Sequence, residues 1–211
     1  MEVKDRRFSV NTLLPTLSVH DNVLENPDAL RKTLLATEFK PFDGVDGGHY
    51  ENTSTEPPFA PPFAPVIERI LGATPDFKLA GWRLDLEGQS SPNHCHADSV
   101  YDAEWACVYY LNPPEQQYGG TAFWTHKLTG LDRLPSDDLL KSAGFNLAAW
   151  HTGMTAQTFD ESAWTLAGCV AMRYNRLIIY PTRVWHSRMP AGGFGTGVKN
   201  GRLVGVGFFN V

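Results

Sequence analysis

Short segments rich in aromatic and β-branched residues fill the chain from Lys78 onward, and they constrain the fold more than any other feature. Gly, Pro and Asn separate these segments, which is typical of an antiparallel β domain. We predict strands at 78–86, 105–112, 119–126, 175–182 and 202–210. The expected architecture is a two-sheet β barrel or jelly roll whose inward-facing positions can line a pocket, with a sandwich that has no cavity as the alternative.

The first part of the chain predicts helices and a connector. Asn26-Pro27 is typical of a helix start, and leucines at helical spacing follow it. The proline-rich segment Thr55–Pro65 is expected to be an ordered connector, because proline does not fit a helix interior or a central strand. A second short helix is expected to begin at Pro65 and to end at Gly72.

The domain organisation that follows is a single domain, 1–211. Residues 1–77 form a helical extension and connector packed on one sheet, and residues 78–211 form the β core. A long excursion at about 127–172 contains SDDLLKSAGF and DESAWTLAGCVAM, is expected to be helical in part, and is interpreted as a wall or lid of a pocket.

Composition excludes several classes of protein. The formal net charge is -5, which argues against a nucleic-acid-binding surface. Cys95, Cys107 and Cys169 are odd in number and widely spaced, so they predict neither a disulfide framework nor a paired-cysteine zinc site. No segment has the length and apolar character of a signal peptide or a membrane span, so we expect a cytoplasmic protein without a membrane partner.

Three residues form a candidate metal site. His96 and Asp98 stand two positions apart, so an extended backbone places both side chains on one face. His186 follows a strongly apolar strand and lies near its end, where functional side chains tend to gather. Two histidines and one carboxylate are the facial triad of iron(II) oxygenases, which leaves open positions for an oxoacid and dioxygen.

Arg202 is the candidate partner for the distal carboxylate of such an oxoacid. A buried carboxylate needs a counter-charge, and arginine binds it bidentately. Arg202 follows Asn200-Gly201, a tight hairpin signal, and begins a strand. Alternation places Arg202 with Val204 and Val206 on one face of that strand.

Four ordered segments resemble the prolyl-hydroxylase branch of the 2-oxoglutarate and iron(II)-dependent dioxygenase superfamily. They are H-A-D, then C-V-Y-Y-L-N-P followed by G-G-T-A-F, then L-I-I-Y-P-T-R-V-W-H-S, and finally G-R-L-V-G-V-G-F-F. The resemblance covers roughly His94 to Phe209 and implies a double-stranded β-helix of the jelly-roll or cupin-like kind. It also implies iron(II) and 2-oxoglutarate as cofactor and co-substrate.

The resemblance assigns roles to individual positions. His96, Asp98 and His186 would hold the iron, and Arg202 would bind the C5 carboxylate of 2-oxoglutarate. Tyr110 would support that carboxylate.

At some positions the sequence leaves more than one candidate for the same role. Alternation does not decide which of Tyr109 and Tyr110 faces the pocket. Lys199 is the alternative to Arg202, since a glycine-rich loop lengthens the interval after His186. His94 competes with His96, but the family pattern has a single residue between histidine and aspartate.

Trp124, His126 and Arg188 lie just beyond the strands that would border the iron, and they are candidates for the substrate side or for rim packing.

The function implied is oxidation, most simply hydroxylation, of a small molecule, an amino acid or a peptide, with release of succinate and CO2. Related halogenases replace the metal-binding carboxylate with a small residue, so Asp98 favours hydroxylation. The alternatives are a non-catalytic or degenerate cupin-like protein that binds a metal or small ligand, and a zinc hydrolase that uses the same three residues. The sequence does not specify the substrate or the oligomeric state.

Overall fold

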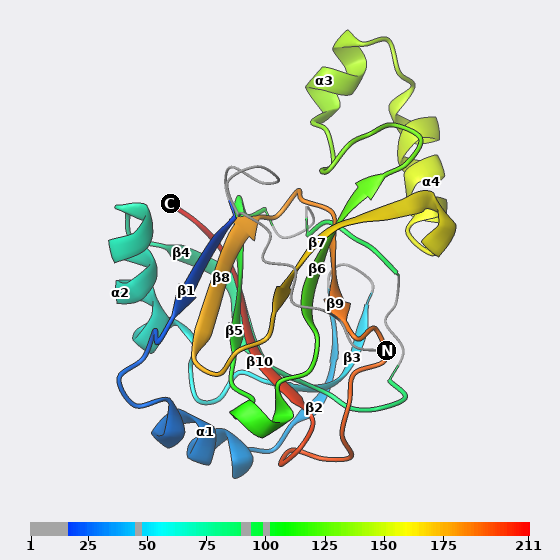
Figure 1. Ribbon diagram of the computed structural model, residues 1–211. Coiled ribbons are helices and arrows are strands. Elements are labelled where there is room, and N and C mark those ends of the chain that lie inside the picture. Colours follow the sequence, from blue (N-terminus) through cyan, green and yellow to red (C-terminus); the bar gives the residue numbers. More distant parts are fainter. Residues whose placement is uncertain (1–16, 45–47, 90–93, 99–101) are drawn as a thin grey trace.

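Two antiparallel sheets lie at the centre of the computed structural model, which describes residues 17–44, 48–89, 94–98 and 102–211 (Figure 1). The larger sheet has the strand order β1-β8-β5-β10-β4-β3-β2, and the smaller has the order β7-β6-β9. The strands are β1 (Ser18–Asp21), β2 (Lys40–Asp43), β3 (His49–Ser54), β4 (Asp76–Asp85), β5 (Trp105–Tyr110), β6 (Gly120–His126), β7 (Trp164–Ala171), β8 (Arg176–Pro181), β9 (His186–Met189) and β10 (Arg202–Asn210).

The inner face of the larger sheet packs against the smaller sheet. Val108, Ile178 and Val204 contribute from the larger sheet, and Phe123 contributes from the smaller one. The outer face of the larger sheet is covered by α1 (Pro27–Leu35) and α2 (Ala60–Leu71), as Figure 1 shows. This arrangement is a mainly β, jelly-roll-like fold with N-terminal helices on one sheet, as the sequence predicted.

Helix α1 begins as predicted. The side chain of Asn26 accepts a hydrogen bond from the backbone N–H of Ala29 at 3.0 Å, and Pro27 occupies the first turn. Leu34 is fully buried beneath the sheet. Local capping chemistry therefore determines where this helix starts.

Helix α2 corrects the prediction of a connector up to Pro65. The helix begins at Ala60, so the second half of the proline-rich segment is helical and Pro65 lies inside it. Pro61 and Pro62 occupy the first turn, where backbone N–H groups have no partner in the helix, so they cost little there. Burial of Phe63 and Ile67 against the sheet holds the helix together, and Gly72 ends it at φ 78°.

The excursion between β6 and β8 is helical only in its first part. Helices α3 (Asp137–Ser142) and α4 (Leu147–Gln157) project from one end of the sheets (Figure 1). The segment DESAWTLAGCVAM, which we expected to be helical in part, contains a short 3-10 turn and then β7. Pairing with β6 along its whole length outweighs the helix propensity of its Leu and Ala residues.

Asn200-Gly201 does not form the two-residue hairpin that its sequence indicates. Strand β10 pairs with β4 and β5, and not with the preceding strand β9. The Asn200 side chain instead accepts hydrogen bonds from the N–H groups of Thr196 and Gly197, both at 3.0 Å. The pair closes a turn inside a longer loop, and the predicted start of the strand at Arg202 is confirmed.

Among the helices in the described ranges, none is long and apolar enough to span a membrane.

Candidate active site

A cavity of about 550 Å³ lies between the two sheets. Its walls come from β4 and β10 of the larger sheet and from β6 and β9 of the smaller one. Strand β3 and residues at and after the end of α4 also line it, the latter through Thr155, Thr158 and Phe159. The excursion thus forms one wall of the cavity, as the sequence indicated.

One group of side chains in the described part of the chain could hold a metal ion, and it consists of His96, Asp98 and His186. One ligand atom from each of these residues lies within 4.8 Å of the others. The structure therefore brings together the three residues that the sequence proposed as iron ligands.

Backbone hydrogen bonds position this cluster. His96 and His186 form an antiparallel bridge in which each N–H donates to the other carbonyl, at 3.0 and 2.9 Å. The N–H of Asp98 donates to the carbonyl of Thr182 at 2.7 Å. These bonds fix the loop that carries His96 and Asp98 against the strand that carries His186.

The histidines and the aspartate of the cluster stabilise each other's charged forms. Burial alone would raise the pKa of the Asp98 carboxyl, but the neighbouring His186 and His96 hold this pKa below its ordinary value. Burial alone would lower the pKa of His186, but Asp98, with Oδ2 3.1 Å from His186 Nε2, holds it above its ordinary value.

The donor set fits a divalent transition metal. His186 Nδ1 lies 2.9 Å from the carbonyl of Val184, to which it can donate, and this contact leaves Nε2 as the atom that faces Asp98. Two imidazoles and one carboxylate occupy one face of an octahedral ion, so three positions remain for other ligands.

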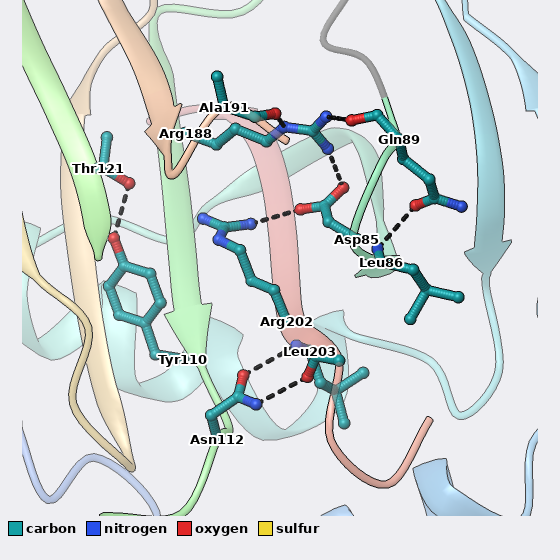
Figure 2. Close-up of polar contacts among 11 residues, drawn as sticks. Asp85, Leu86, Gln89, Tyr110, Asn112, Thr121, Arg188, Ala191, Arg202 and Leu203 are labelled. Carbon is teal, nitrogen blue, oxygen red and sulfur yellow. Dashed lines mark hydrogen bonds and ion pairs between the residues drawn. The ribbon is translucent and has the colours of Figure 1, made fainter. Parts of the chain in front are cut away.

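Arg202 and Arg188 line the same cavity as the metal cluster, and both donate to Asp85 (Figure 2). Arg202 is 4% exposed, and its Nη1 donates to Asp85 Oδ2 at 2.7 Å. Arg188 Nη1 donates to the other oxygen of Asp85 at 2.6 Å. Burial alone would raise the pKa of Asp85, but the two arginines hold it below its ordinary value, so this carboxyl is ionised near neutral pH.

The two adjacent tyrosines of β5 face opposite sides of the larger sheet. Tyr109 packs on the side of the helices and donates to the side chain of Asn175 at 2.8 Å. Tyr110 packs between the sheets but does not itself line the cavity. Its hydroxyl lies 2.6 Å from that of Thr121, which does line it (Figure 2). Burial raises the pKa of Tyr110 to about 12, so its hydroxyl keeps its proton.

Lys199 and Arg202, the two candidate partners for the distal carboxylate, differ in their access to the cavity. Lys199 is exposed on the loop before β10 and does not line the cavity. Arg202, together with Val204 and Val206, faces the cavity, which confirms the predicted alternation along β10. Arg202 is therefore the cation of this strand and loop that a ligand in the cavity can reach.

The candidates for the substrate side divide into two groups. Arg188 lines the cavity, whereas Trp124 and His126 do not. Trp124 donates to the hydroxyl of Ser187 at 2.9 Å. His126 is 1% exposed and bonded to Thr129 and Gln157, so both residues pack beneath the excursion.

His94 and Cys95 also lie away from the cluster. The ring of His94 packs on Trp124, and its Nδ1 lies 3.5 Å from Glu161. Cys95 is fully buried in a separate apolar cluster with Met154.

Sequence reasoning missed Asp85 and Thr121. Asp85 lies directly opposite Arg202 in the pairing of β4 and β10, and Thr121 meets Tyr110 across the two sheets. The signal for Asp85 was its place two residues after Arg83 on the same strand, where both side chains share a face. The register that places it opposite Arg202 is a long-range property.

The family comparison matches residues 85–209, more than half of the chain, to the family described as "Family of unknown function (DUF6445)". The chain belongs to this family. The matched segment begins at Asp85 and contains His96, Asp98, His186 and Arg202. A comparison of this DUF6445 chain with curated proteins gives no match.

Solved structures share the fold. The non-haem α-ketoglutarate-dependent epimerase SnoN from nogalamycin biosynthesis is 16% identical, with 92% of this chain and 77% of that chain covered and a TM-score of 0.51. For the carbocyclase SnoK from the same biosynthesis these values are 12%, 92%, 79% and 0.54. For EctD from S. alaskensis they are 13%, 93%, 73% and 0.50. The resemblance to iron(II) and 2-oxoglutarate-dependent oxygenases is thus confirmed for the fold of this DUF6445 chain.

Proposed function

We propose that this DUF6445 chain is an iron(II) and 2-oxoglutarate-dependent oxygenase. His96, Asp98 and His186 are the proposed iron ligands, and Arg202 is the proposed partner of the distal carboxylate of 2-oxoglutarate. The observation that carries the proposal is the position of both sets in one cavity, with the metal cluster and the buried arginine on its walls. An oxoacid that chelates a metal at one end needs a cation at the other.

The chain's own residues would do three things. His186, oriented by the carbonyl of Val184, and Asp98, oriented by Thr182, would hold the metal on one face and leave the opposite face open. Arg202, with Tyr110 and Thr121 beside it, would dock the far end of the co-substrate. The apolar side chains of Val204, Val206 and Phe208 would keep the space between them dry.

When bound, iron(II) supplies dioxygen activation coupled to the decarboxylation of 2-oxoglutarate to succinate and CO2. SnoN has also been solved in complex with Fe3+, α-ketoglutarate and nogalamycin RO, which supports this pairing of metal and oxoacid for the fold. We propose hydroxylation of a small molecule, an amino acid or a peptide as the reaction, because Asp98 occupies the position that halogenases leave open.

The test is turnover of 2-oxoglutarate without a substrate. Many oxygenases of this class decarboxylate 2-oxoglutarate slowly even when no substrate is bound. We therefore expect more succinate than forms without protein. His186→Ala should remove this succinate, whereas His151→Ala should leave it unchanged, because His151 lies on α4 and pairs with Asp137 outside the cavity. Iron binding with no 2-oxoglutarate binding would contradict the proposal and favour a metal-binding protein without this activity.

A further inference from the structure

Asp85 is a carboxylate of the chain itself, and it already accepts a hydrogen bond from one guanidinium nitrogen of Arg202. The two residues lie directly opposite each other in the antiparallel pair of β4 and β10, so their side chains project from the same face into the cavity. Asp85 is buried, and each of its oxygens accepts from a different arginine. Its position opposite Arg202 is therefore built into the register of the sheet.

Arg188 uses three of its five N–H donors on acceptors of the chain itself. Its Nε donates to the carbonyl of Ala191 at 2.6 Å, its Nη2 donates to the carbonyl of Gln89 at 2.7 Å, and its Nη1 donates to Asp85 (Figure 2). The residue ties two loops to Asp85, and every nitrogen of its guanidinium group is engaged. Arg188 acts on the cavity through its charge and through Asp85.

Arg202 retains free donors. Asp85 uses only its Nη1, and the buried Nε has no hydrogen-bond partner among the described residues. Figure 2 shows that the part of the guanidinium group away from Asp85 lies on the side of Tyr110 and Thr121. A buried N–H without an acceptor is costly, so this edge is suited to an acceptor on a ligand.

Arg188, Arg202 and Asp85 together carry one net positive charge, and Arg83, which also lines the cavity, adds a further positive charge near Asp85. A ligand carboxylate that binds the free edge of Arg202 neutralises one of these positive charges, but it also comes to lie near the carboxylate of Asp85. Like charges a few ångströms apart in a buried site repel strongly. Asp85 therefore stabilises the empty site and at the same time weakens the binding of any dicarboxylate there.

We propose that Asp85 is an internal counter-ion that limits the affinity of this site for the distal carboxylate of 2-oxoglutarate and of its product succinate. This inference rests on the proposed function. Without a ligand, Asp85 compensates the buried charge of Arg202. With a ligand, it lowers the affinity for both dicarboxylates, which allows succinate to leave after each turnover.

The test measures 2-oxoglutarate affinity anaerobically from the visible band of the iron complex, and succinate affinity from its competition with 2-oxoglutarate. Asp85→Asn should bind both dicarboxylates about 10-fold more tightly, because the repulsion it removes exceeds the free energy of a tenfold change. Pyruvate, an oxoacid without the distal carboxylate, should bind the variant and the wild type equally. A structural defect would not produce tighter binding confined to dicarboxylates.

Two further variants complete the charge series. Arg188→Gln removes one positive charge beside Asp85 and should weaken 2-oxoglutarate binding about 10-fold. This variant provides the measurement if Asp85→Asn does not fold. Asp76→Asn is the matched control, because Asp76 lies on the same strand but pairs with Lys78 on the surface. It should bind 2-oxoglutarate as the wild type does.

Unchanged or weaker dicarboxylate binding in Asp85→Asn would overturn the inference, as would an equal change for pyruvate. If Asp85→Asn does not fold, unchanged or tighter binding in Arg188→Gln would overturn it. In each case a wild type that binds 2-oxoglutarate leaves the proposed function intact. A wild type that binds iron but no 2-oxoglutarate refutes both.

Discussion

Asn112 anchors the start of β10, and its replacement by alanine should destabilise the protein strongly. Its side chain is fully buried, donates to the carbonyl of Gly201 at 2.7 Å and accepts from the N–H of Leu203 at 2.8 Å (Figure 2). These two backbone groups flank Arg202. Asn112→Ala leaves both without their partner, and each unsatisfied buried group costs about 1–3 kcal/mol, so we expect a loss of about 2–6 kcal/mol.

The assay is chemical denaturation followed by fluorescence, together with the melting temperature. For a chain of this size 1 kcal/mol corresponds to about 2–4 °C, so Asn112→Ala should melt roughly 4–24 °C lower. Gln116→Ala is the control, because Gln116 accepts from Asn112 only at 3.4 Å and should matter little. A loss below about 1 kcal/mol in Asn112→Ala, with an unchanged denaturant slope, would refute the anchoring role.

Three further predictions test the packing, the charges and the tyrosines. Gly205→Ala should cost about 1–3 kcal/mol in denaturation, because its methyl group would overlap a buried ring and lie 2.8 Å from another, whereas Gly153→Ala in α4 has open space and should stabilise by up to about 1 kcal/mol. The folded pKa of Asp85 is lowered, so its contribution to stability is present above about pH 4 and is lost as the pH falls through the folded pKa. The stability gap between wild type and Asp85→Asn, about 3 kcal/mol, should therefore be constant from pH 8 to pH 5 and shrink below about pH 4; a gap that grows in acid would contradict this. Tyr110→Phe should weaken 2-oxoglutarate binding roughly 3–10-fold, while Tyr109→Phe should cost only about 1 kcal/mol of stability; equal effects on binding would show that the two faces are not distinct.

The strands of the core could be predicted because their pattern is local. The segments of β4, β5, β6, β8 and β10 each carry apolar and aromatic residues at strand spacing, and all five were found within two residues of the predicted ends. Helix α1 was found from its capping residue. In these elements the burial pattern and the end signals lie within a few neighbouring residues.

The remaining strands could not be predicted because their stability comes from distant partners. Strand β3, HYENTS, is polar and pairs near the edge of the larger sheet, so it lacks an apolar alternation. Strand β7 has residues compatible with a helix and becomes a strand through its pairing with β6. Helix α2 contains prolines that local rules place outside a helix, because the packing of its buried face on the sheet stabilises it.

In the candidate site, too, the residues with a local or ordered sequence signal were predicted, and a residue that depends on long-range pairing was not. His96 and Asp98 were found from their spacing, and His186 and Arg202 from the order of the motifs in the chain. Asp85 was missed because only the register of β4 with β10 places it opposite Arg202.

The proposed assembly of iron and 2-oxoglutarate in this cavity is tested most directly by anaerobic addition of both to the purified chain. The wild type should develop the visible metal-to-ligand charge-transfer band of the chelated oxoacid. His186→Ala should show no band, and Arg202→Ala should need far more 2-oxoglutarate to reach it. The absence of a band in the wild type, or an unchanged band in His186→Ala, would contradict the account.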